Sequence, residues 1–112
     1  MYSNELIKGT LKTIILKLLA DNGRMYGYEI TQKVKLLSDE KINLTEGALY
    51  PALHKLQAED LIIAETEVIN GRKRKYYSVT PNGLDSATSR SNEFADFVKT
   101  MLGILNPQIA GK

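Results

Sequence analysis

Apolar residues recur along most of this chain at the three- and four-residue intervals that place side chains on one face of an α-helix. Residues 5–20 form the first such segment, with Ser3 or Asn4 as its cap. Gly23 suits the left-handed position that ends a helix. The apolar stripe of this segment is wide enough to contact two neighbouring elements. Its central positions are Leu11, Ile14, Ile15, Leu18 and Leu19.

A second, shorter helix is expected over residues 25–37, followed by a polar connection over residues 38–44. A third helix begins at Glu46, because the Thr45 hydroxyl can accept a hydrogen bond from the first turn, and it runs to about residue 59. Three helices joined by short connections are typical of a helix-turn-helix. The inner face of the third helix carries Leu49, Leu53 and Leu56.

Pro51 falls inside the third helix, where it removes one backbone donor and its ring crowds the carbonyl of Gly47. We therefore expect a bend near the start of this helix. A surface that docks its N-terminal half into a partner could use such a bend. A tolerated kink on a solvated face is the alternative interpretation.

Two strands are expected next, at residues 61–69 and 75–80, since both segments are rich in β-branched and aromatic residues. Asn70-Gly71 lies between them and favours a type I′ hairpin turn, in which both central residues have positive φ. The pair predicts a short two-stranded arm with basic residues at its tip and on its returning strand.

The last helix starts at Thr80-Pro81, which supplies a capping hydroxyl and a proline at the first helical position. From there to about residue 105 apolar and small residues alternate at steps of three and four, the seam of a coiled coil. Such a seam predicts a dimer interface. Asn106-Pro107 ends the helix. The seam consists of Leu84, Ala87, Ser91, Phe94, Val98, Met101 and Leu105.

The composition is that of one small domain, since 43% of its 112 residues are apolar. No run of 18 apolar residues and no signal-peptide pattern occur, so we expect a soluble, cytoplasmic protein without a membrane partner. The absence of cysteine excludes disulfides, thiolate metal sites and cysteine nucleophiles.

The positive charge of the chain is concentrated at one place. Residues 72–75 carry four cations, whereas the whole chain has a formal net charge of +2, so the remainder is net acidic. One compact basic patch indicates a positioned contact with phosphates or another anionic surface.

An enzyme is the weakest function class. The chain has one histidine and no cysteine, and no glycine-rich phosphate loop follows a strand. Histidine and carboxylate residues do not occur at metal-ligand spacing, so no metal or other cofactor is expected.

Four motifs together, in their order and spacing, resemble the PadR family of bacterial transcriptional regulators. The resemblance covers nearly the whole chain, and the Gly-Ala-Leu-Tyr-Pro and Arg-Lys-Tyr-Tyr runs are its most specific part. The motifs are Tyr26-Gly27-Tyr28-Glu29-Ile30, Glu46-Gly47-Ala48-Leu49-Tyr50-Pro51-Ala52-Leu53, Arg74-Lys75-Tyr76-Tyr77 and Thr80-Pro81-Asn82-Gly83.

The resemblance implies an α+β, mainly α fold: a winged helix-turn-helix over residues 1–80, a dimerisation helix over 81–106 and a flexible tail over 107–112. It also implies a homodimer that represses genes by binding an inverted-repeat operator. The single C-terminal helix resembles the short branch of the family. Some short members bind flat compounds through a tryptophan between their C-terminal helices, but this chain has none, which argues against that route for a small hydrophobic effector.

In a helix-turn-helix the N-terminal residues of the second helix of the motif meet base edges in the major groove. Tyr50 could contact phosphate or a thymine methyl, Pro51 could pack on that methyl, and Lys55 could reach phosphate or guanine. A lone solvated histidine is an equally good interpretation of His54. The candidates on this helix are Thr45, Tyr50, Pro51, His54 and Lys55.

The hairpin arm supplies the candidate phosphate contacts Arg72, Lys73, Arg74 and Lys75. Because side chains alternate along a strand, the two arginines face one side and the two lysines the other. A solvated hairpin tip is the alternative, which a neighbouring helix-turn-helix makes the weaker one. Tyr26, at the start of the second helix, is a further candidate phosphate contact.

Two alternatives stay open for the surfaces of the protein. Phe94, Val98 and Met101 could line an effector cavity, although filling a dimer interface is the favoured interpretation. A dimeric winged-helix module that docks an acidic protein, without reading bases, is the rival to a DNA-binding regulator. Sequence-selective binding of duplex DNA would separate the two.

Overall fold

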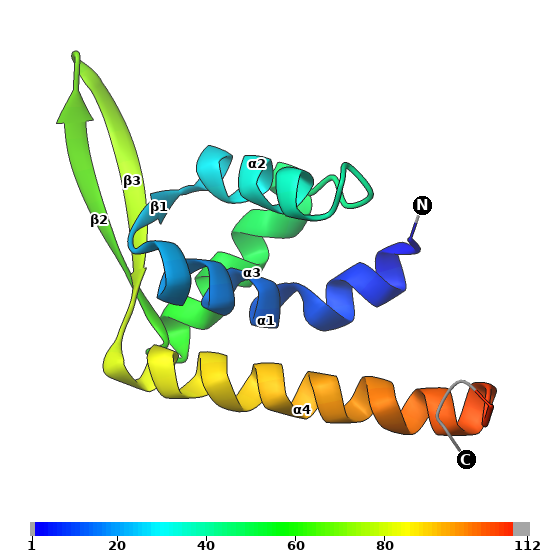
Figure 1. The fold of residues 1–112 in the computed structure, drawn as a ribbon. Helices are drawn as coiled ribbons and strands as arrows, with labels where there is room; N and C mark the ends of the chain where they lie inside the picture. Colours follow the sequence, from blue (N-terminus) through cyan, green and yellow to red (C-terminus); the bar gives the residue numbers. More distant parts are fainter. Residues whose placement is uncertain (1, 109–112) are drawn as a thin grey trace.

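The computed structural model describes residues 2–108, in which a small antiparallel sheet lies at one side of a group of helices (Figure 1). The mainly α, winged helix-turn-helix fold with a long C-terminal helix is confirmed. The predicted tail, residues 107–112, lies mostly outside the described residues. The elements are α1 (Asn4–Asn22), β1 (Met25–Tyr26), α2 (Gly27–Leu37), α3 (Glu46–Ala58), β2 (Ile62–Ile69), β3 (Arg72–Val79) and α4 (Pro81–Leu105).

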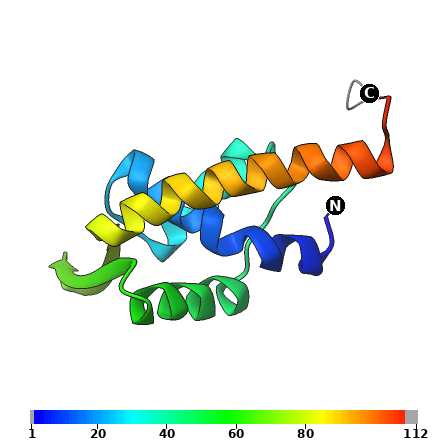
Figure 2. The ribbon, with the colours of Figure 1, turned by 90° about the horizontal axis from the view of Figure 1, so that it is seen from below.

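Helix α1 is the centre of the packing. It contacts α2, α3, β3 and α4, which is why its apolar stripe is wider than one partner needs. Figure 1 shows α2 on one side of α1 and α4 on the other, and Figure 2 shows α3 along one edge of the molecule. The core consists mainly of Ile15, Leu16, Leu19, Ile30, Leu49, Leu53, Leu56, Ile62 and Tyr77.

Three helices begin where a hydroxyl caps them. The Ser3 side chain accepts from the backbone N–H of Leu6, so Asn4 is the first helical residue and not the cap. Thr45 accepts in the same way from Ala48 at 3.2 Å, and Thr80 from Gly83 at 3.0 Å. Each bond satisfies one N–H that the first turn leaves unpaired.

The sheet has the strand order β1-β3-β2. Asn70 and Gly71 have φ values of 51° and 77°, the two positive angles that a type I′ turn requires. This tight turn starts β3 at Arg72, three residues earlier than the sequence predicts, so the basic residues belong to the ladder itself. The two-residue strand β1, which the sequence pattern assigns to a helix, pairs with β3 at Tyr76 and Tyr77. We call β2, the turn and β3 the wing.

The end of α3 and the start of α4 are tied together by short contacts. The Thr80 hydroxyl donates to the carbonyl of Asp60 at 2.7 Å, and the Thr80 N–H donates to the carbonyl of Leu61 at 3.1 Å. The Asn82 amide adds a hydrogen bond to the Asp60 carboxylate. A Cβ at Gly83 would lie only 1.9 Å from the Leu61 carbonyl oxygen, so only glycine fits there. These contacts hold the start of α4 against the end of α3.

Candidate nucleic-acid interface

Helix α3 has one buried face and one open face. Leu49, Ala52, Leu53 and Leu56 are buried against the core, as the sequence predicts for the three leucines. The open face lies at the edge of the molecule (Figure 2). Helix α3 runs from Glu46 through Pro51 to Ala58 as one element. Five predicted site residues are exposed on it: Thr45, Tyr50, Pro51, His54 and Lys55.

Tyr50 leans from α3 toward the start of α2. A Cβ built on Gly27 would come within 2.5 Å of the Tyr50 hydroxyl oxygen, so this phenol lies directly against the α2 backbone. Its side chain is 36% exposed, which leaves one edge open to a ligand. Thr45 is likewise partly engaged, because its hydroxyl caps the helix. Both residues therefore help to position α3.

Tyr77 lies beneath this junction, on the core side of β3. Its hydroxyl is buried, and among the described residues it has no hydrogen-bond partner. Burial raises the pKa of this phenol, and the neighbouring Tyr50 phenol raises it further. Tyr77 therefore remains neutral, and its ring packs in the core beneath the end of the wing that lies opposite the turn.

Tyr26, a predicted phosphate contact, lies in the middle of a cluster of side chains on the outer face of the sheet. The Arg74 guanidinium lies 4.2 Å above its ring centre, and the Tyr76 ring meets it edge-on at 5.6 Å. The Arg24 guanidinium lies 4.3 Å above the Tyr76 ring. Cation–π and edge-to-face contacts of this kind stabilise a surface by about 0.5–1 kcal/mol each. We call Arg24, Tyr26, Arg74 and Tyr76 the arginine–tyrosine cluster.

Charged groups extend the arginine–tyrosine cluster across the sheet. Glu67, opposite Arg74 on β2, forms a salt bridge with Arg24. Because the guanidinium donates to it, the pKa of the Glu67 carboxyl lies below its usual value and the pKa of Arg24 above its own. Hydrogen bonding with Tyr76 likewise raises the pKa of Arg74. Arg74, one of the four predicted wing contacts, is thus half-buried and packs on Tyr26.

The other wing cations, Arg72, Lys73 and Lys75, are exposed. Arg72 shares the strand face of Arg74, while Lys73 and Lys75 share the opposite face, as strand alternation predicts. In Figure 1 the wing tip points away from α4.

The structure brings together a second basic group that sequence reasoning misses. Lys8 and Lys12 of α1, Lys55 of α3 and Arg90 of α4 line one groove of about 150 Å³. We call it the basic groove. These four residues are scattered along the chain, so no run of charge marks them. Only the packing of three helices makes them neighbours.

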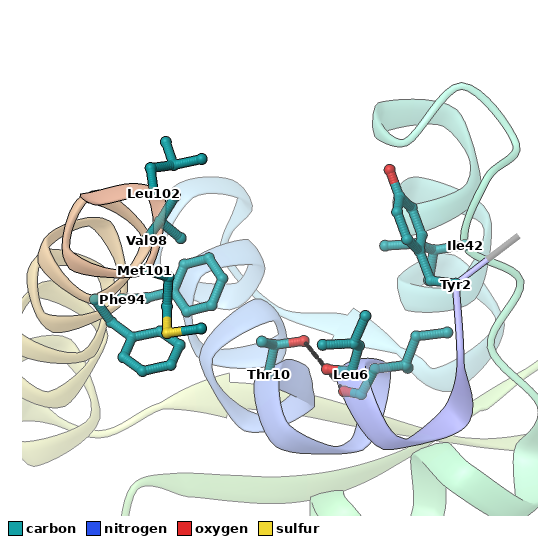
Figure 3. A pocket seen from close by; sticks show the side chains of 10 residues that line it. Tyr2, Leu6, Thr10, Ile42, Phe94, Val98, Met101 and Leu102 are labelled. Carbon is teal, nitrogen blue, oxygen red and sulfur yellow. Dashed lines mark hydrogen bonds between the residues drawn. The ribbon is translucent and has the colours of Figure 1, made fainter. Parts of the chain in front are cut away.

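An apolar groove of about 400 Å³ lies between the N-terminal half of α1 and the C-terminal half of α4 (Figure 3). Thr10 is one of the polar residues that line this groove. Its hydroxyl donates to the Leu6 carbonyl at 3.0 Å and so offers no free donor. The predicted seam residues Phe94, Val98 and Met101 line it. The heptad pattern does not mark its other apolar walls, which are Tyr2, Leu6, Ile7, Ile42, Phe97 and Leu102.

The remaining seam residues divide between two surroundings. Leu84 and Leu105 are exposed, and Ser91 is half-buried. Ala87 is only 2% exposed within the single chain and belongs to its core, while its place in the dimer interface stays a prediction. The heptad pattern alone does not show which chain covers a small residue.

Among residues 2–108, His, Asp and Glu side chains form no group of three that could hold a metal ion. In the same part of the chain, every helix is too short or too polar to span a bilayer.

The geometry, an exposed helix beside a basic hairpin, coincides with a family match. The model of the transcriptional regulator PadR-like family matches residues 15–89. The chain belongs to this family. It is therefore a PadR-like transcriptional regulator, which implies DNA-binding regulation and no enzymatic activity.

Relatives support the assignment over nearly the full chain. The transcriptional regulator Rv3488 of Mycobacterium tuberculosis is 32% identical over 99 residues, which cover 88% of this chain and 89% of that protein. A transcriptional regulator from Clostridium thermocellum superimposes with a TM-score of 0.82 at 29% identity, covering 92% of this chain and 99% of the other. A PadR-like regulator from Bacillus cereus gives 0.75 at 29% identity, covering 92% and 98%.

Proposed function

We propose that this PadR-like chain is a cytoplasmic, homodimeric repressor that binds an inverted-repeat operator sequence-specifically. The observation that carries the proposal is the exposed face of α3 next to an exposed basic wing. In Figure 1 both the N-terminal end of α3 and the wing tip lie away from α4. An α-helix is about 10–12 Å wide, and the major groove is about 12 Å wide, so α3 fits there.

Within α3, Pro51 and His54 are the residues that face away from the core and reach the base edges. Lys55 lies to one side of them and meets phosphate. Tyr50 lies to the other side, where its open edge meets the backbone or a thymine methyl next to α2. Thr45 fixes the end of the helix that enters the groove.

In the wing, Arg72, Lys73 and Lys75 bind phosphates, whereas Arg74 and Tyr26 hold the wing against α2. Phosphate contacts orient a protein on the duplex without reading its sequence. The division of labour is thus base reading by α3 and positioning by the wing.

The dimer forms through the apolar face of α4, and the second copy covers the apolar groove. Phe94 is 43% exposed and Phe97 54% exposed in the single chain, and further apolar side chains extend the surface to Leu105. Contiguous apolar surface of this kind marks an interaction site. In the dimer, two α3 helices about 34 Å apart would read successive turns of one duplex face.

A small hydrophobic effector that relieves repression is the remaining part of the proposal. The apolar groove touches α1 and α4 at once, so a ligand there would change the packing of the dimer helices (Figure 3). Operator affinity measured with and without a hydrophobic dye at increasing concentration tests this: an unchanged affinity despite bound dye contradicts effector control at this site.

Selection of duplexes from a random pool tests the central proposal. We expect an inverted repeat to be enriched and to bind far more tightly than a scrambled duplex at the same salt concentration. His54→Ala and Pro51→Ala should relax the preference between bases, because they change the reading face. Lys73→Ala with Lys75→Ala should weaken binding to all duplexes alike. It should also reduce the slope of log affinity against log salt concentration by about 0.9 per lost phosphate contact.

Equal affinity for every duplex would contradict base reading by α3. The protein would then be a dimeric interaction module, and its basic wing would bind an acidic protein partner.

A further inference from the structure

The basic groove lies on the flank of α3 that faces away from the wing. Lys55 follows Tyr50 by five residues, which is about 140° around the helix. Tyr50 contacts Gly27 at the start of α2, whose neighbour Tyr26 holds the wing through Arg74. The α2 start and the wing therefore share the Tyr50 flank. The other flank carries Ala48, Pro51 and Lys55, which line the basic groove together with α1 and α4.

Cations outnumber acids in this groove. Its lining contains Lys8, Lys12, Lys55 and Arg90 and no carboxylate. Glu59 approaches from the end of α3 and pairs with Lys12 at 2.9 Å. The Lys12 ammonium, and to a smaller extent Arg90 and Lys55, hold the pKa of this carboxyl below its usual value.

The cations are held in different ways. Lys8 and Lys55 are exposed and free to reach outward, whereas Arg90 is half-buried and donates from Nε to the Ser86 hydroxyl at 3.1 Å. Glu5 and Glu93 line the adjoining groove beyond Arg90 and Gly9, so they do not close the opening next to Pro51. The basic groove thus presents a net positive surface continuous with the outer face of α3.

We propose that the basic groove binds phosphates of the operator, on the strand opposite to the one contacted by the wing. This proposal rests on the proposed function. A helix that fills the major groove has a sugar–phosphate backbone along each of its flanks. The wing and the α2 start serve one backbone, and Lys8, Lys55 and Arg90 serve the other. Duplex phosphate, not a separate small anion, is the occupant because Pro51 and Ala48 belong both to the groove wall and to α3.

Two variants with matched controls test the proposal on the full-length protein. Lys8→Gln and Arg90→Gln remove one cation each from the groove. Lys17→Gln and Lys99→Gln remove one cation each from the same helices, nine residues further on, which is half a turn away on the opposite face. The measurement is the slope of log affinity against log salt concentration for the selected operator.

We expect Lys8→Gln and Arg90→Gln each to reduce the slope by about 0.9 and to weaken specific and scrambled duplexes by the same several-fold factor. The two controls should keep the wild-type slope. Sedimentation must show the wild-type oligomeric state for Arg90→Gln; if it does not, Lys8→Gln alone decides.

Two outcomes overturn the proposal in distinguishable ways. If the wild-type protein selects an operator but both groove variants keep its slope, the groove proposal fails and the repressor proposal stands. If the wild-type protein binds no duplex, both fail.

Discussion

At the scale of the residue, Gly27 decides where Tyr50 can lie. The Tyr50 phenol occupies the space that any larger side chain at position 27 would need. Gly27 and Tyr50 belong to two of the family motifs. The sequence does not show that they touch, because residues of α2 and α3 meet only after the core has formed. A contact between the first turn of α2 and the first half of α3 thus sets the angle of α3.

Gly27→Ala should therefore displace Tyr50, lower the free energy of unfolding by about 1–3 kcal/mol and weaken operator binding. Urea denaturation and operator titration measure the two effects. Tyr50→Phe should restore much of the lost stability in the Gly27→Ala background, since the closest clash is with the hydroxyl. No rescue by Tyr50→Phe would show that the clash is not the cause.

Gly9→Ala is the matched control, because it also replaces a helical glycine but meets nothing within 4 Å. It should raise the free energy of unfolding by about 0.5–1 kcal/mol through helix propensity alone.

At the scale of the element, local chemistry predicts most of the fold. The three capping hydroxyls, the Asn-Gly turn and the helical periodicity act within a few residues, so the sequence predicts where helices and strands begin. Strand β1 is missed because its partner β3 is distant in sequence. The first residues of β3 pair with β2 just across the turn, and they are missed because a run of arginine and lysine lacks the β-branched and aromatic residues typical of a strand. The exposed wing and α3 were predictable site elements; the basic groove, assembled from three helices, was not.

The wing gives a prediction at this scale. Arg74→Ala should remove the cation–π contact with Tyr26, about 0.5–1 kcal/mol, and speed hydrogen exchange of the β2 and β3 amides. Arg74→Lys should restore little of this stability and protection from exchange, because an ammonium does not stack as a planar guanidinium does.

Arg72→Ala is the control, since Arg72 lies on the same strand face but is exposed. It should reduce the slope of log affinity against log salt concentration for DNA binding and leave the exchange of the β2 and β3 amides unaltered. Equal exchange in both variants would contradict a holding role for Arg74.

At the scale of the whole molecule, α4 exposes apolar side chains that the single chain leaves uncovered. Its apolar side chains extend well beyond the core of one chain, and they make the groove with α1 that no described residue fills. The partner copy completes the surface in our proposal.

Phe97→Glu should dissociate the dimer, because a carboxylate would be buried against apolar partner side chains. Sedimentation should report a monomer, and circular dichroism should report unchanged helix content, since Phe97 is exposed in the single chain. Lys99→Glu, on the polar side of the same helix, should remain dimeric. A dimer that survives Phe97→Glu would place the interface elsewhere.

The tight contact between Gly83 and the Leu61 carbonyl has a mechanical consequence. Because α4 extends from this contact as one long helix, a small change of its angle here produces a large displacement at its far end. At 1.5 Å per residue, Leu102 in the apolar groove lies about 29 Å from this point. A tilt of about 5° there corresponds to a displacement of roughly 2.5 Å at Leu102. In our proposal, an effector bound at the far end of α4 would therefore have the largest effect on the orientation of α3.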